Sequence, residues 1–143
     1  MKPDPTDLTL PERDRQELIT WSVACAERLL PVFSADRPDD WRPREALDGA
    51  LQFAEGQMTV GQIRKLAFGC HAAAREASEY ASTAVARACG QAVAVAHMAG
   101  HSRELVRYTK KALAGSELAR ELEWQKAHVP GRFREYVYPD ADG

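Results

Sequence analysis

Two histidines four residues apart are the side chains best spaced for chemistry in this sequence. His97 and His101 would project from one face of a continuous helix, where two imidazoles can hold a transition metal ion. Met98 stands where the helix of a zinc protease would carry its glutamate, and Gly100 is placed to end the helix before His101. No Glu-x-x-His pair occurs, so the usual ligands of a di-iron bundle are missing.

A third histidine could complete such a site. His71 follows Cys70 on an earlier predicted helix, and it would approach the other two histidines if the helices run antiparallel. The alternative function is therefore a helical metal- or small-ligand-binding domain that uses His71, His97 and His101. The more ordinary interpretation is that these histidines are buried or interfacial, with hydrogen bonds to neighbouring carbonyls or carboxylates.

A catalytic cysteine would need a base in reach, and Cys70, Cys89 and His71 form the only plausible set. Both cysteines fall on apolar stripes among alanines, where a thiol behaves as a small hydrophobe with a raised pKa. The sequence contains no phosphate-binding glycine loop, no GxSxG turn and no kinase motif. We therefore expect no enzyme activity, no catalytic residue and no cofactor.

Carboxylates cluster in one predicted loop, where arginines are interleaved with them: Asp36, Arg37, Asp39, Asp40, Arg42 and Arg44. Neighbouring arginines lower carboxylate pKa values, which suits an ion-paired loop and suits a general acid poorly. Trp41 lies inside this loop, and tryptophan and arginine are frequent anchors of protein interfaces. The loop is thus either a partner-binding surface centred on Trp41 or an ion-paired loop with a partly buried tryptophan.

A second charged feature is the basic stripe on a predicted helix over 102–114, formed by Arg103, Arg107, Lys110 and Lys111. Most such stripes are solvated surface, and the alternatives are an acidic protein partner or a phosphate backbone. Trp124 lies between Glu123 and Gln125, at another polar boundary.

Composition limits the class of protein. The 143 residues are 45% hydrophobic and 28% charged, as in one soluble globular domain. Residues 1–56 carry a net charge of -5 and residues 57–143 carry +3, so a nucleic-acid partner is not expected. We see no apolar run near the roughly 20 residues that cross a bilayer and no secretory signal, which predicts a cytoplasmic protein without a membrane partner. Three widely spaced cysteines are typical of reduced, buried thiols.

Helices must position these side chains. Glycines, prolines and capping residues predict an all-α, single-domain bundle of about six helices, over residues 9–33, 42–55, 59–77, 82–99, 102–114 and 116–128. The expected N-caps are Thr9, Asp39 or Asp40, Thr59 with Gln62, Ser102 and Ser116, and Gly56 is the expected stop. Thirteen alanines from Ala67 to Ala99 predict close pairing of the third and fourth helices, within one chain or across a homodimer.

The predicted organisation has three parts. Residues 1–8 form an N-terminal tail, residues 9–128 form the helical domain, and residues 129–143 form a short extended C-terminal arm. The arm is expected to lie against the bundle, because its aromatic residues Phe133, Tyr136 and Tyr138 would be unusual in a disordered end.

Three stretches together resemble the Imm5-like family of bacterial immunity proteins of polymorphic toxin systems. They are the loop and helix start Arg37–Ala46 (RPDDWRPREA), the segment His71–Arg75 (HAAAR) and the segment Ala86–His101. The resemblance covers roughly residues 9–126. It implies an all-helical cytoplasmic protein that neutralises a cognate protein toxin by binding it, without enzyme activity.

The resemblance also implies a set of motif residues that bind a partner or hold the helices in register: Asp39, Asp40, Arg42, Arg44, His71, Arg75, Arg87, His97 and His101. Trp41 joins them as a candidate anchor. Gln91 stands where we expect a histidine in relatives, which removes one candidate metal ligand. The acidic first part of the chain suggests the hypothesis that the toxin is basic, as a nuclease would be.

Overall fold

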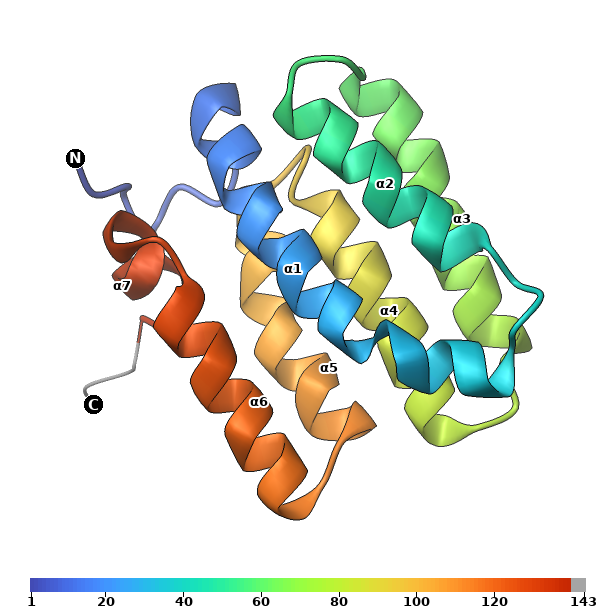
Figure 1. Cartoon of the computed structure of the whole chain (residues 1–143). Helices are drawn as coiled ribbons and strands as arrows, with labels where there is room; N and C mark the ends of the chain where they lie inside the picture. Colours follow the sequence, from blue (N-terminus) through green and yellow to red (C-terminus); the bar gives the residue numbers. More distant parts are fainter. Residues whose placement is uncertain (140–143) are drawn as a thin grey trace.

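The computed structural model describes residues 1–139, and all regular structure in that range is helical. Its helices, labelled in Figure 1, are α1 (Glu12–Asp36), α2 (Arg42–Ala54), α3 (Val60–Glu76), α4 (Tyr80–Ala94), α5 (Glu104–Ala112), α6 (Gly115–His128) and α7 (Arg134–Val137), with the short 3-10 helices η1 (Ala99–Arg103) and η2 (Gly131–Phe133). No strand occurs among residues 1–139. The predicted all-α fold class is confirmed, and α1 to α6 account for the expected number of main helices.

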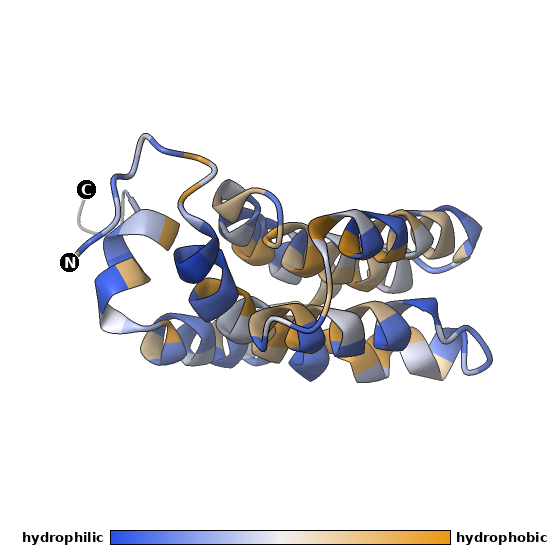
Figure 2. Ribbon diagram, turned by 90° about the horizontal axis from the view of Figure 1, so that it is seen from above, coloured by the Kyte–Doolittle hydropathy of each residue, from blue (hydrophilic) through white to orange (hydrophobic). Residues whose placement is uncertain are grey.

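Helix α4 lies at the centre of the bundle, where it packs against α1, α2, α3 and α5. In Figure 1, α1 and α2 lie in front of α3, α4 and α5, and Figure 2 shows the same arrangement from above as two layers of helices. Fully buried large side chains such as Leu18, Phe33 and Phe53 belong to the same core cluster as the alanines of α4. Small residues on the central helix thus let the surrounding helices approach it.

The alanine-rich helices α3 and α4 share the most extensive contact of the bundle. Ala73, Ala74, Ala88 and Ala92 are all buried. The predicted close pairing of these helices is therefore confirmed within one chain, while a homodimer stays a prediction.

Helix α1 is shifted by three residues relative to the predicted span and is bent. It continues three residues beyond the predicted end at Phe33, although Pro31 lies inside it. A proline within a helix cannot donate its backbone hydrogen bond and bends the helix, and Figure 1 shows the last turns of α1 changing direction before the connection to α2. This bend aims the α1–α2 loop at the end of α3.

The expectation that no segment approaches membrane-spanning length needs a correction at α1. By length and composition alone α1 could cross a membrane, and 56% of its most apolar window is buried inside the fold. Its buried side chains pack on α2 and α4, as in the core helix of a globular protein.

Two helix boundaries that rest on local chemistry are confirmed. The Thr59 hydroxyl accepts from the backbone N–H of Gln62 at 3.2 Å, and the Gln62 side chain accepts from the backbone N–H of Thr59 at 2.9 Å. This reciprocal capping box starts α3. Gly56, just after α2, has a φ of 75°, a left-handed conformation that glycine adopts without strain.

Three predicted N-caps are wrong because tertiary packing dominates the local signals. Leu10 adopts a φ of 58° with its side chain buried, so the carbonyl of Thr9 accepts from Ala99 instead of starting α1. Ser102 is buried within η1, and Ser116 lies inside α6, which begins one residue earlier. Neither serine side chain caps a helix.

The C-terminal arm is helical where an extended arm was expected. Phe133 and Tyr136 are buried and Tyr138 is half-buried, so the expected packing of the arm on the bundle is confirmed. Their spacing of three residues places Phe133 and Tyr136 on one side of η2 and α7, which explains why this short segment is helical. Residues 140–143 of the predicted arm lie outside the described residues.

The N-terminal tail lies against this arm. Lys2 forms an ion pair with Glu135 at 2.8 Å, and the hydroxyl of Tyr136 donates to a backbone carbonyl of the tail at 2.8 Å. We call this contact between residues 1–10 and residues 130–138 the terminal seam.

Candidate functional site

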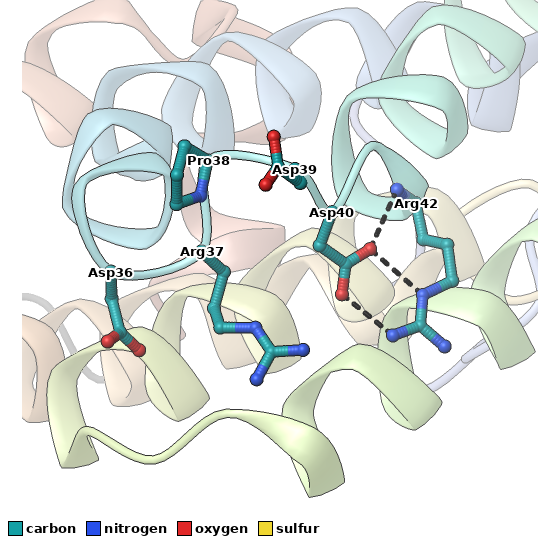
Figure 3. Close-up of a pocket in the computed structure, with 6 residues that line it drawn as sticks. All are labelled: Asp36, Arg37, Pro38, Asp39, Asp40 and Arg42. Atoms are coloured by element: carbon teal, nitrogen blue, oxygen red, sulfur yellow. Dashed lines mark hydrogen bonds and ion pairs between the residues drawn. The ribbon is translucent and has the colours of Figure 1, made fainter.

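The loop between α1 and α2 is held by one carboxylate. Asp40 accepts hydrogen bonds from the Nε of Arg42 at 2.9 Å, from its Nη2 at 2.7 Å and from its backbone N–H at 3.2 Å (Figure 3). Hydrogen bonding from the Arg42 side chain holds the pKa of Asp40 below its usual range, although burial opposes this effect. The predicted N-cap at Asp39 or Asp40 is therefore wrong, because Trp41 occupies that position, although the Asp40 side chain accepts from the first backbone N–H of α2.

Arg42 also fastens the loop to α3. Its guanidinium donates to both carboxylate oxygens of Glu76 at 3.1 Å, and the hydrogen bonds that it donates to Asp40 and Glu76 raise the pKa of Arg42. Arg37 donates to the backbone carbonyl of Glu76 at 2.9 Å. The loop is therefore pre-organised by contacts with the last turn of α3.

Arg44 belongs to the same motif but points to other partners. It pairs with Glu27 of α1 at 3.0 Å and with Asp48 of α2 at 3.6 Å. The arginines of the motif therefore hold α1, α2 and α3 together, as expected for an ion-paired loop.

Trp41 does not join this network, because 69% of its surface is exposed. It lines a mostly apolar hollow of about 380 Å³ between α2 and α3, and its chain neighbours Asp40 and Arg42 line a more polar one of about 470 Å³ within the loop. We call this region the Trp41 surface, and it consists of Asp36, Arg37, Pro38, Asp39, Asp40, Trp41, Arg42, Arg44, Glu45, Asp48, Gly49, Gln52, Met58 and Leu66. The alternative of a partly buried loop tryptophan is wrong.

The Trp41 surface is acidic on balance, with five carboxylates against three guanidinium groups. Arg42 and Arg44 are already paired within the fold. Asp39 and Glu45 are exposed, and within residues 1–139 neither side chain has an ion pair or hydrogen bond. The surface therefore offers two unpaired carboxylates beside an exposed aromatic ring.

The three motif histidines meet in a second place, a cavity of about 140 Å³ between α3 and the chain around the end of α4. We call it the histidine pocket, and it is lined by Arg64, Ala67, Phe68, His71, Gln91, Ala94, His97 and His101. The sequence-based expectation that His71 approaches His97 and His101 is met. The aromatic rings of His97 and His101 lie edge to face, with centroids 5.1 Å apart.

The orientation of His71 is set by two neighbours. Its Nδ1 lies 2.9 Å from a guanidinium nitrogen of Arg87, and because arginine only donates, Nδ1 accepts and the proton of the neutral ring lies on Nε2. The ring packs on the backbone of Gly90, where an added Cβ would lie 2.7 Å from His71 Cε1. Gly90 is therefore required for this close approach.

The other two histidines differ in their partners. His101 Nδ1 donates to the side-chain oxygen of Gln91 at 2.7 Å, whereas His97 Nδ1 is buried with no hydrogen-bond partner in the described part of the chain. Burial lowers the pKa of each histidine in the pocket. Positive neighbours lower the pKa of His71 and His97 further, through Arg87 and Arg64 respectively.

The alternative metal site is not supported. Among residues 1–139 no group of three histidine, cysteine or carboxylate side chains is arranged to hold a metal ion. His71 points one ring nitrogen at a guanidinium, which repels a cation, and His101 uses one nitrogen on Gln91. The histidines share a cavity without converging on one point.

The cysteines behave as expected from their apolar surroundings. Cys25, Cys70 and Cys89 are all free and buried. Burial raises the pKa of Cys70 to about 12 and raises the pKa of Cys89 well above its ordinary value. A thiol of this kind is a poor nucleophile at neutral pH.

Other candidate residues fall outside both regions. Arg75 is exposed on α3 and contributes positive charge near His71. Arg103 of the predicted basic stripe donates to backbone carbonyls of the terminal seam, so the stripe is partly structural. Trp124 is half-buried, with Arg28 4.1 Å from its ring centroid.

Several residues of the candidate site were not predicted. Arg64 and Phe68 precede His71 by seven and three residues, so helical periodicity places all three on one face and could have found them. The sequence drew attention to Gln91 only because a histidine is expected there in relatives. The side-chain oxygen of Gln91 nevertheless orients His101 by accepting its hydrogen bond. Glu76 lies too far from the loop in sequence for any local signal to reveal it as a partner of Arg42.

Residues 8–132 match the family described as "Imm-5 like putative immunity protein". No match was found among curated proteins or among solved structures. Because the matched residues span most of the sequence, this chain belongs to the Imm-5 like family of immunity proteins.

Proposed function

We propose that this protein neutralises a protein toxin by binding it through the Trp41 surface, without catalysis. Membership of an immunity-protein family supports a toxin partner in general terms. The observation that carries the choice of surface is Trp41, whose ring is 69% exposed although the loop around it is fixed by ion pairs. A rigid aromatic anchor loses little conformational entropy on binding and can supply much of the affinity.

The charge of the surface supports a basic toxin. Glu45 lines the same hollow as Trp41, Asp39 lines the neighbouring one, and neither has a partner among residues 1–139, so a lysine or arginine of the toxin gains a carboxylate and an aromatic face together. Opposite charges also accelerate association, an effect that salt screens. The proposal places this encounter in the cytoplasm, where the three free thiols would remain reduced.

The test is co-expression with candidate toxins from the same genome, with growth as the first readout and binding kinetics of the rescued pair as the second. Trp41→Ala should weaken binding at least about tenfold, as expected for an interface anchor. Tyr80→Ala is the matched control, since Tyr80 is 70% exposed and lines neither hollow. Equal affinity of the Trp41→Ala variant and the unmodified protein would refute this surface.

A pair of double variants tests whether the carboxylates near Trp41 accelerate association. The double variant Asp39→Asn with Glu45→Gln should slow association and reduce its salt dependence. The double variant Glu117→Gln with Glu123→Gln removes the same charge from exposed positions on α6 and should leave the rate unchanged. If both double variants slow association equally, the effect comes from net charge and the toxin does not meet the Trp41 surface.

A further inference from the structure

The residues that line the histidine pocket are Ala67, Phe68, Ala94 and several side chains with N–H donors, and no carboxylate is among them. The neutral His71 ring carries its proton on Nε2, because Arg87 donates to the other nitrogen. The amide group of Gln91 keeps its N–H donors, because its oxygen is the atom that accepts from His101. Arg64 adds a permanent positive charge at the wall.

The charges around the pocket are mostly positive as well, although the whole chain carries -2. The groups that act on the three rings from the surrounding elements are Arg64, Arg75, Arg87, Arg15 and Glu104, together with the rings themselves. Glu104 is the single carboxylate among them and acts on His101. Such a field favours an anion and opposes protonation of the empty pocket.

One polar atom of the residues that line the pocket lacks a partner. His97 Nδ1 is shielded from the cavity and from solvent, and no described residue donates to it or accepts from it. An unpaired buried nitrogen costs free energy. Protonation makes the His97 ring cationic, and an anion in the cavity would stabilise that charge.

We infer that the histidine pocket binds a single oxyanion group, a phosphate or a carboxylate, and that His97 takes up a proton when the anion binds. The cavity of about 140 Å³ has room for one such group, whereas drug-sized ligands occupy pockets of about 300–1,000 Å³. Phe68, 65% exposed at the wall, leaves the pocket next to open surface. The anion can therefore be free phosphate or a carboxylate carried by a larger molecule.

The experiment is a titration of the purified, untagged protein with inorganic phosphate and, separately, with acetate at constant ionic strength in chloride. Imidazole NMR signals of His71, His97 and His101 should shift in a saturable way with one common dissociation constant, on the order of millimolar for so small a ligand. Calorimetry in two buffers of different ionisation enthalpy should show net proton uptake. The anion that binds more tightly identifies the source. If neither anion gives a saturable shift, the proposal is overturned.

Matched variants locate the site. Arg64→Gln should weaken binding about tenfold or more by removing a charged donor, whereas Lys65→Gln removes the same charge from the next, exposed residue and should change affinity less than about twofold. Equal losses in both variants would show nonspecific attraction and overturn the proposal. His97→Gln should abolish most of the proton uptake while the protein stays folded, and unchanged uptake would overturn the role of His97. No toxin is present in this experiment, so its failure leaves the proposed toxin binding unaffected.

Discussion

The Trp41 surface and the histidine pocket use opposite flanks of α3, and each flank meets a glycine of the neighbouring helix. On the α2 side, Gly49 faces the side chains of Leu66 and Met58. On the α4 side, Gly90 faces the ring of His71. Flexible aliphatic ends can move aside, whereas an imidazole clamped by Arg87 cannot, so the two flanks differ in rigidity.

Charge separates the two regions further. Near Trp41, hydrogen bonding from the Arg42 side chain lowers the pKa of Asp40. In the histidine pocket, burial lowers the histidine pKa values and keeps the rings neutral. The Trp41 surface therefore keeps its negative charge at neutral pH. The histidine rings are neutral at that pH and become charged only when they are protonated.

The largest expected loss of stability is at Gly90, on the rigid α4 flank of α3. Gly90→Ala should lower the free energy of unfolding by about 1–3 kcal/mol, because its Cβ would lie 2.7 Å from His71 Cε1. Gly49→Ala should cost less than about 1 kcal/mol, because Leu66 and Met58 can rotate and alanine favours the helix. Urea unfolding of both variants gives the comparison, with Gly69→Ala as a control whose nearest contact is 3.8 Å. Equal losses of unfolding free energy in Gly90→Ala and Gly49→Ala would contradict the difference in rigidity between the two flanks.

A second prediction concerns the ionised loop. Asp40→Asn should lower the free energy of unfolding by about 0.5–1.5 kcal/mol at neutral pH, because three hydrogen bonds from Arg42 weaken and that arginine is partly solvated. The native pKa of Asp40 lies below its ordinary value of 3.8, so the contribution of Asp40 to stability is complete above that pH and is lost as pH falls through the lower native value. The difference between the variant and the unmodified protein should therefore shrink in strong acid.

The control for the loop is Asp39→Asn, which removes an exposed carboxylate without partners among the described residues. It should leave stability unchanged within about 0.5 kcal/mol. A loss as large as that of Asp40→Asn would mean that general acidity of the loop matters more than the Asp40–Arg42 pair.

Histidine titration gives a smaller effect, because the rings of His71, His97 and His101 are only half-buried. Their native pKa values lie below 6.5, so the unfolded chain binds more protons as pH falls below that value, and stability declines through the native pKa values. The free energy of unfolding should be higher at about pH 7.5 than at about pH 5.5, and His97→Gln should narrow the difference. A flat pH profile in the unmodified protein would contradict the neutral state of the pocket.

The smallest effect belongs to Trp41. Trp41→Ala should change the free energy of unfolding by less than about 0.5 kcal/mol, since its ring is mostly exposed and lies outside the ion-pair network. Thermal unfolding measures this directly. A large loss of stability would show that Trp41 supports the fold, and any loss of toxin binding by the variant could then reflect unfolding.

Local chemistry explains which parts of the fold were predictable. The capping box of Thr59 and Gln62 and the left-handed Gly56 involve residues close in sequence, and both predictions are confirmed. Thr9 fails because the neighbouring Leu10 turns to bury its side chain, which depends on distant packing. The predicted helix over 9–33 runs through Pro31, as α1 does, but the continuation of α1 to Asp36 was not predicted.

In the candidate site, too, sequence spacing predicted some features and tertiary packing decided the others. Helical spacing predicted that His71, His97 and His101 could meet, and they share one cavity. Their partners Arg87 and Gln91 could not be assigned from the sequence, because the relative rotation of two helices decides which side chains face the rings. The exposure of Trp41 likewise depends on the aim of the loop after the bend at Pro31.

The terminal seam has a consequence for how the chain reaches its native state during synthesis. Lys2 and Glu135 are separated by 133 positions, so the tail has no seam to join until synthesis has reached Glu135. Contacts of such long range form late because they must overcome the loss of chain entropy. Helices α1 to α4 can assemble earlier on the growing chain, and docking of the two ends then becomes the closing step of folding.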